Sequence, residues 1–125
     1  MNTKIKVLFS LMIFGLCSQS VFSFEPAEKF KSTCLSCHTI GGGDKIGPDL
    51  KGVSKRRSMD WIVKFVQYPE GMIKGDPEEP GYEKKDKVAE ELFNKYKTIM
   101  TEQDLSEDQI KQMITWIEAQ KEVIK

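Results

Sequence analysis

Apolar residues recur at spacings of three and four positions in several segments of the chain, which is the spacing of one buried helix face. In the first such segment, Phe24, Ala27, Phe30 and Cys34 share a face. Acidic side chains occupy its first turn, where the helix dipole favours negative charge. This pattern predicts an N-terminal helix over residues 24–37.

A second helix is predicted between Ser58 and Pro69. Ser58 is a candidate N-cap, and an apolar stripe that begins at Trp61 follows it. Residues 69–83 then contain three Pro and three Gly with little periodicity, which predicts a loop.

Two more helices are predicted in the C-terminal half. One runs from about Lys84 to Tyr96, with an apolar face at spacings of four. The other begins at a capping box, Ser106 to Gln109, and its apolar residues at i, i+3, i+4 and i+7 carry it to about Lys121. No segment alternates strictly as a half-buried strand would, so the predicted fold class is all α.

Glycines separate the first helix from the second. Gly41-Gly42-Gly43 stops any helix, and Gly47-Pro48 marks a turn. The three glycines fit either a flexible surface loop or a close approach of the backbone to a bound group.

The first 23 residues are typical of a secretory signal peptide. Lys4 and Lys6 form a positive start, and an apolar stretch of signal length follows, too short to span a bilayer comfortably. Cleavage after Ser23 would leave residues 24–125 as one domain, and cleavage after Ser20 is the alternative. We therefore expect an exported protein with no transmembrane span after cleavage.

The number and distribution of charged side chains bear on which partners the protein can have. The predicted mature domain has 17 basic and 19 acidic side chains, which makes nucleic acid an improbable partner. The charges are unevenly placed, with a net +4 over residues 45–74 and −4 over residues 75–91. Lys51, Lys55, Arg56 and Arg57 form a basic cluster that either guides a partner or is an ordinary solvated face.

The candidate chemistry lies in Cys34-Leu35-Ser36-Cys37-His38, a C-x-x-C-H run. Two thiols three residues apart on a helical turn can form thioethers with one haem, and the following His can bind its iron. A redox dithiol or half of a zinc site are the alternatives. However, His38 is the only His and no Cys follows it, so zinc would need carboxylates. We expect one covalently attached haem c per chain.

The second axial ligand decides whether such an iron transfers electrons or binds external molecules. Met113 lies on an apolar helix face, and Met59 lies in an opening helical turn. Met72 and Met100 fall in predicted loops, where a thioether can reach a metal without breaking a helix.

Together, Cys34–His38, the Gly47–Val53 stretch, the Trp61 helix and a Met loop before a closing helix resemble a bacterial class I (mono-haem) cytochrome c. The resemblance implies a cytochrome c fold of four or so helices around one haem, with crossing terminal helices. It makes Cys34 and Cys37 the attachment residues and His38 and Met100 the axial ligands.

The same resemblance implies roles for neighbouring residues. Pro48 would accept a hydrogen bond from His38 Nδ1, and Leu50 would pack on the haem. Phe30 would cross the C-terminal helix near Trp116 and Ile117. Arg56 or Arg57, with Trp61, would lie near a propionate.

One departure concerns the residue after Met100, which is commonly Pro in this family and is Thr101 here. Because Pro would stiffen that loop, the distal bond is expected to be weaker. Met72 and an open iron site therefore stay as alternatives.

The function expected from these features is one-electron transfer in the periplasm of a bacterium, by a monomer that is not an enzyme. The donor would be a quinol-oxidising complex or a dehydrogenase, and the acceptor a terminal oxidase or reductase. The alternatives are a five-coordinate haem protein, such as a peroxidase or gas sensor, and a dedicated haem subunit of a membrane redox complex.

Overall fold

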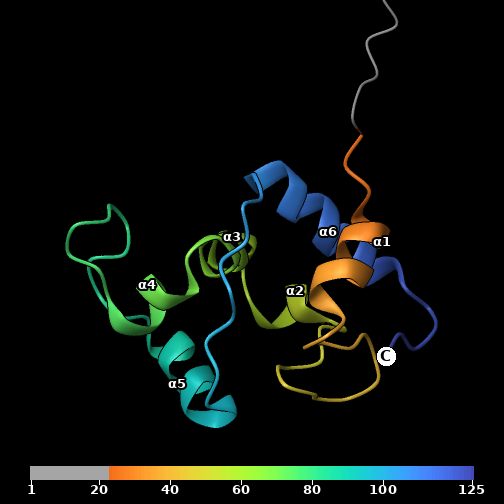
Figure 1. Cartoon of the computed structure of the whole chain (residues 1–125), viewed down its shortest axis with the longest axis horizontal. Helices are drawn as coiled ribbons and strands as arrows, with labels where there is room; N and C mark the ends of the chain where they lie inside the picture. The colour runs from red at the N-terminus through yellow and green to blue at the C-terminus, as the bar shows by residue number, and fades with distance from the viewer. Residues whose placement is uncertain (1–22) are drawn as a thin grey trace, which may run out of the picture.

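The computed structural model describes residues 23–125 (Figure 1). The predicted signal peptide lies outside the described residues except for Ser23. In chain order the elements are α1 Pro26–Lys29, the π-helical turn η1 Phe30–Cys34, α2 Val53–Arg56, α3 Met59–Gln67, α4 Pro69–Lys74, α5 Lys87–Tyr96 and α6 Glu107–Ala119. Extended pairing within residues 23–125 is limited to one antiparallel bridge between Ile40 and Ile124, so the all-α prediction is confirmed.

The N-terminal helix begins two residues later than predicted, because Pro26 takes the first helical position, where its missing N–H costs nothing. At Phe30 the helix widens into the π-helical turn, which ends with Leu35 N–H donating to Phe30 O at 2.9 Å. The last residue of this turn is Cys34, so the C-x-x-C-H run begins where the N-terminal helix ends.

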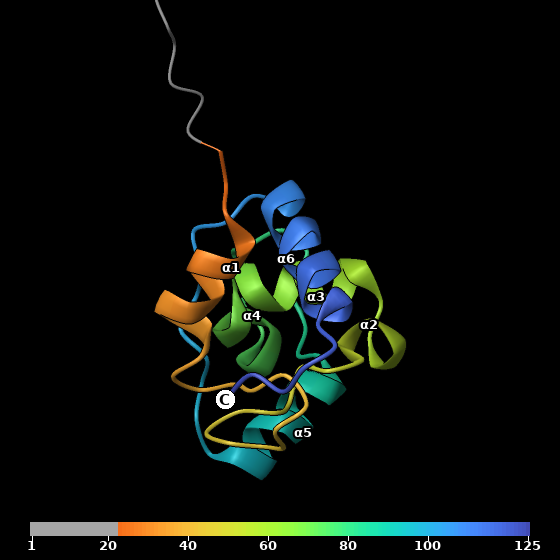
Figure 2. The same ribbon diagram turned by 90° about the vertical axis from the view of Figure 1, so that its right-hand side faces the viewer.

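The terminal helices pack against each other, as predicted. Phe30 is fully buried and its ring lies 5.4 Å from that of Trp116 in α6, tilted by 46°. Two perpendicular views place α1 beside α6 (Figures 1 and 2). The capping box at Ser106 starts α6 as expected, and the helix ends at Ala119, two residues early.

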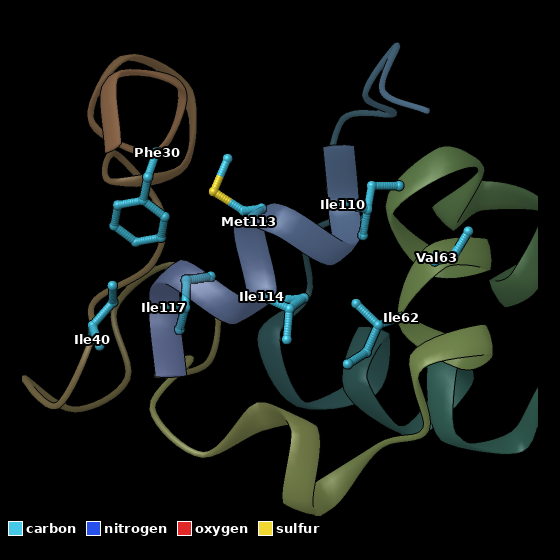
Figure 3. Close-up of a cluster of buried hydrophobic side chains, with 8 residues drawn as sticks. All are labelled: Phe30, Ile40, Ile62, Val63, Ile110, Met113, Ile114 and Ile117. Atoms are coloured by element: carbon cyan, nitrogen blue, oxygen red, sulfur yellow. The ribbon is translucent and has the colours of Figure 1, made fainter. Parts of the chain in front are cut away.

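The main core lies between η1, α3 and α6, with Ile40 from the loop after η1 (Figure 3). Its buried members are Phe30, Ile40, Ile62, Val63, Ile110, Met113, Ile114 and Ile117. A second, smaller core joins α3, α4 and α5, where Met72, Ile73 and Ala89 are buried against partly buried aromatic side chains.

The prediction of a loop over residues 69–83 is wrong for its first six residues, which form α4. Pro69 and Gly71 suggested a break, but Pro69 occupies the first helical position, where proline is favoured. Burial of Met72 and Ile73 in the second core then stabilises this short helix, because tertiary packing outweighs weak local propensity.

The start of α5 is also corrected, from Lys84 to Lys87. Asp86 is the N-cap, and its side chain accepts a hydrogen bond from Ala89 N at 2.9 Å. The same carboxylate oxygen accepts the indole N–H of Trp61 at 3.0 Å, which fixes α5 against α3.

Candidate functional site

The two predicted attachment thiols lie on one helical turn. Cys37 N and His38 N both donate to Cys34 O, at 3.0 and 2.9 Å, so the backbone of the run is closed on itself. Both cysteines are half-buried free thiols. Burial raises the pKa of the Cys34 thiol, although Lys29 acts against it.

His38 is held in one orientation beside these thiols. Its Nδ1 lies 2.8 Å from Pro48 O, the contact that the resemblance implies. Because a carbonyl oxygen only accepts, Nδ1 carries the proton and Nε2 keeps the lone pair that a metal needs. Burial lowers the pKa of His38, while the Pro48 carbonyl raises it, so the neutral imidazole is favoured.

Gly47 packs directly against the His38 ring, a role that sequence reasoning did not assign to it. A Cβ built on Gly47 would lie 2.6 Å from His38 Cε1, closer than any real contact. The Gly47 N–H donates to Cys37 O at 2.8 Å, which fixes this loop to the Cys turn. The Gly-Pro dipeptide was the sequence signal, but it indicates only a turn.

The glycine-rich loop is organised around a carboxylate. Asp49 accepts the N–H groups of Gly41 at 2.7 Å, Gly43 at 2.8 Å and Lys51 at 2.9 Å. Gly41 and Gly43 have φ of 78° and 89°, values that side-chain-bearing residues rarely adopt. Burial raises the pKa of Asp49, but these backbone donors outweigh it and lower the pKa overall.

A second carboxylate ties this loop to α5. Asp44 Oδ1 accepts Asp49 N at 3.1 Å, while its Oδ2 accepts Lys95 Nζ at 2.9 Å and the Tyr96 hydroxyl at 2.6 Å. The Tyr96 and Lys95 donors hold the pKa of Asp44 well below its usual range. These contacts span more than 50 residues of sequence, so no local pattern indicated them.

The candidate distal ligands occupy different environments. Met100 is half-buried in the segment 97–106 between α5 and α6, without helical structure. Met72, expected in a loop, is instead 5% exposed within α4 and belongs to the second core. Met113 is 6% exposed in the main core, and Met59 packs against that core.

The segment that carries Met100 is fixed at its far end. Gln103 N donates to Val66 O and Gln67 Nε2 donates to Leu105 O, both at 3.0 Å. These bonds attach the residues before α6 to the end of α3.

Two members of the basic cluster are engaged with the fold. Arg56 donates to Lys51 O at 2.6 Å and to Asp49 O at 2.7 Å, and the Arg57 guanidinium lies 5.4 Å from the Trp61 ring centroid. Since the indole N–H of Trp61 donates to Asp86, it is not free for a propionate.

The donor set around Cys34 fits a covalently attached haem. Two free thiols stand three residues apart, and the neutral imidazole of His38 has one nitrogen committed to Pro48 and the other available. Leu35 and Leu50 are partly buried and pack against the main core. The part of the chain that the structure describes offers no cluster of three or more His, Cys, Asp or Glu for another metal.

Comparison with known proteins agrees with this assignment. The cytochrome c family model matches residues 26–121, so the chain belongs to the cytochrome c family. It has the cytochrome c fold and carries a covalently attached haem c.

Relatives of known sequence include a cytochrome c-553-like protein of Synechocystis sp., 35% identical over 71 residues. That match covers 56% of this chain and 62% of the relative's length. Cytochrome c of Stellaria longipes is 30% identical over 89 residues, covering 54% of this chain and 82% of the plant protein.

Solved structures with the same fold include a cytochrome c from Rhodothermus marinus, with a TM-score of 0.58 and 29% identity over 74% of this chain and 73% of that one. A cytochrome c domain from Pseudomonas putida gives a TM-score of 0.59 and 30% identity over 75% of this chain and 85% of that domain. The fold and the family together define a haem protein of the cytochrome c class.

None of the helices in residues 23–125 is long and apolar enough to cross a membrane.

Proposed function

We propose that the protein is an exported one-electron carrier whose haem is attached through Cys34 and Cys37, with His38 and Met100 as axial ligands. The observation that carries the proposal is the His38 imidazole, fixed by Pro48 O at 2.8 Å beside two free thiols. When bound, the haem supplies the one-electron chemistry; the chain supplies attachment, orientation and burial.

Two observations support Met100 over Met72 as the distal ligand. Met100 lies in a non-helical segment, where its side chain can reach a metal without breaking a helix. Met72 is 5% exposed in α4, so ligation would remove it from the second core and leave a cavity there.

Matched Leu substitutions test this assignment, because Met and Leu have similar volumes. Met100→Leu should abolish the long-wavelength sulfur-to-iron absorption band of the oxidised protein and lower its reduction potential, since a thioether favours the reduced form. Met72→Leu should leave the band intact. An unchanged band in the Met100 variant would contradict the ligand assignment.

Carbon monoxide binding separates the carrier from a five-coordinate haem protein. With both axial positions filled, the reduced parent should bind carbon monoxide slowly, whereas the Met100 variant should bind it rapidly. Rapid binding by the parent would favour a gas-binding or peroxidase function.

The donor and acceptor proposed are a quinol-oxidising complex or dehydrogenase and a terminal oxidase or reductase. Mass measurement of the protein from a periplasmic fraction tests export and locates cleavage after Ser23 or Ser20. Gel filtration of the native extract distinguishes a free monomeric carrier from a subunit that co-elutes with a membrane complex.

A further inference from the structure

Asp44 joins the proximal His to the segment before Met100 through a continuous series of hydrogen bonds. His38 Nδ1 donates to Pro48 O at 2.8 Å, and the N–H of the same peptide group, that of Asp49, donates to Asp44 Oδ1 at 3.1 Å. The other Asp44 oxygen accepts the Tyr96 hydroxyl at 2.6 Å. One peptide group and one carboxylate therefore connect His38 to the end of α5.

We propose that Asp44 is a positioning residue that controls two properties of the haem iron: its reduction potential, through the Pro48–Asp49 peptide, and its retention of Met100, through Tyr96. The second part rests on the proposed function, because it takes Met100 to be the distal ligand.

The first effect follows from polarisation of the peptide group. A carboxylate bound to a peptide N–H makes the carbonyl at the other end of that group a stronger acceptor, as in other hydrogen-bonded chains. A stronger acceptor at His38 Nδ1 raises the basicity of the ligand nitrogen. A more basic ligand stabilises oxidised iron, so ionised Asp44 should lower the reduction potential.

The second effect follows from where the Met100 segment begins. Residue 97 comes directly after Tyr96, and the far end of the segment is attached to α3 through the Gln103 and Gln67 hydrogen bonds. Displacing Met100 requires this segment to move. Asp44 restrains its near end, and the views in Figures 1 and 2 place loop 41–50 beside the end of α5.

Two substitutions separate the effect on the reduction potential from the effect on Met100. They change the negative charge available on Asp44 in opposite directions. Asp44→Asn removes the negative charge, so the reduction potential should rise. Tyr96→Phe removes a donor that draws charge away from the carboxylate, so the potential should fall. Both weaken the link to α5: Tyr96→Phe removes the shorter of its two hydrogen bonds, and Asp44→Asn replaces the carboxylate that accepts Tyr96 and Lys95 with an uncharged amide. Both should therefore tighten imidazole binding to the oxidised protein, by up to about tenfold, which corresponds to about 1.4 kcal/mol.

The controls match each substitution. Glu122→Gln neutralises another exposed carboxylate, and Tyr82→Phe removes a tyrosine hydroxyl that donates to Lys64 O at 3.2 Å and not to Asp44. Neither should change imidazole affinity. Measurements at low and high salt exclude a purely through-space effect, which salt screens, whereas the hydrogen-bonded path persists.

Amide exchange gives a readout that is independent of the iron. The Asp49 N–H should exchange faster in Asp44→Asn than in the parent, because its acceptor is weakened, while the Gly41 N–H should stay protected by Asp49.

Each outcome decides the proposal. Potential shifts of opposite sign with tighter imidazole binding in both variants support it. Shifts of the same sign, or imidazole affinities within twofold of the parent, overturn it even where the variants are less stable to denaturant. A parent that lacks the sulfur-to-iron band overturns the proposed function and the Met100 part, whereas a parent with the band and unchanged variants overturns only the role of Asp44.

Discussion

The Cα of Gly47 lies so close to the His38 ring that a methyl group on it would stand 2.6 Å from Cε1. Backbone and ring are therefore in direct contact, and the Gly47 N–H also donates a hydrogen bond to Cys37 O. The orientation of the His38 imidazole therefore depends on the absence of a side chain at position 47, as well as on the hydrogen bond to Pro48 O.

Gly47→Ala should displace the His38 ring and destabilise the protein by about 1–3 kcal/mol, the usual cost of overpacking. The expected signs are a changed absorption spectrum and a lower midpoint in guanidinium unfolding. Gly43→Ala is the matched control: its Cβ would meet nothing within 4 Å, but its φ of 89° is strained for alanine. It should lose about 1 kcal/mol with an unchanged spectrum. An unaltered spectrum in both variants would contradict the ring-contact argument.

Asp49 should contribute to stability in a pH-dependent way. Its folded-state pKa lies below its unfolded value, so the native protein binds fewer protons and gains stability above the usual carboxyl range of about 4. That contribution is lost as the pH falls through the lower, folded-state pKa.

Asp49→Asn should therefore cost about 1–3 kcal/mol at pH 7, because an ionised acceptor of three backbone N–H groups is removed. The difference between parent and variant should shrink as the pH falls below about 4. Unfolding free energies measured at several pH values check this. Asp44 and Glu118 also have lowered pKa values and contribute to acid sensitivity in both proteins. The quantity to compare is therefore the difference in unfolding free energy between the parent and Asp49→Asn at each pH. A pH-independent difference would exclude the charged form as the cause.

The capped helices were predictable from sequence because each cap and stripe lies within a few residues. Ser58 and Ser106 both accept the N–H three residues on, as their patterns predicted. By contrast, α4 was missed because Pro69 and Gly71 have the composition of a loop, and only burial against α5 makes them helical.

The site was predictable only in part for the same reason. The C-x-x-C-H run is contiguous and indicates haem attachment directly. The hydrogen bonds that hold the surrounding structure in place join residues that are distant in sequence. Tyr96 donates to Asp44, 52 positions away, and Trp61 donates to Asp86, 25 positions away. Single-sequence patterns carry no information on such pairs.

Lys97 ends α5 in the left-handed conformation, with φ of 55° and ψ of 25°. Glycine is the favoured residue there, because a Cβ makes this conformation costly. Lys97→Gly should stabilise the protein by about 0.5–1 kcal/mol. A glycine placed inside the helix, as in Asn94→Gly, should instead destabilise the protein by about 0.3 kcal/mol. Thermal unfolding of both variants gives shifts of opposite sign, and a loss of stability in Lys97→Gly would show that its side chain matters more than its backbone.

Removal of both thiols tests how far the fold depends on its haem. A described domain of about 100 residues buries little more than about 60% of its unfolded surface, so a bound group contributes much of the core. Cys34→Ala with Cys37→Ala should abolish covalent attachment and leave a chain with much less helical circular dichroism and no cooperative thermal transition. Phe30→Leu is the control, since it perturbs the packing of α1 on α6 while both thiols remain. A double variant with full helicity and a cooperative transition would show that the two cores suffice.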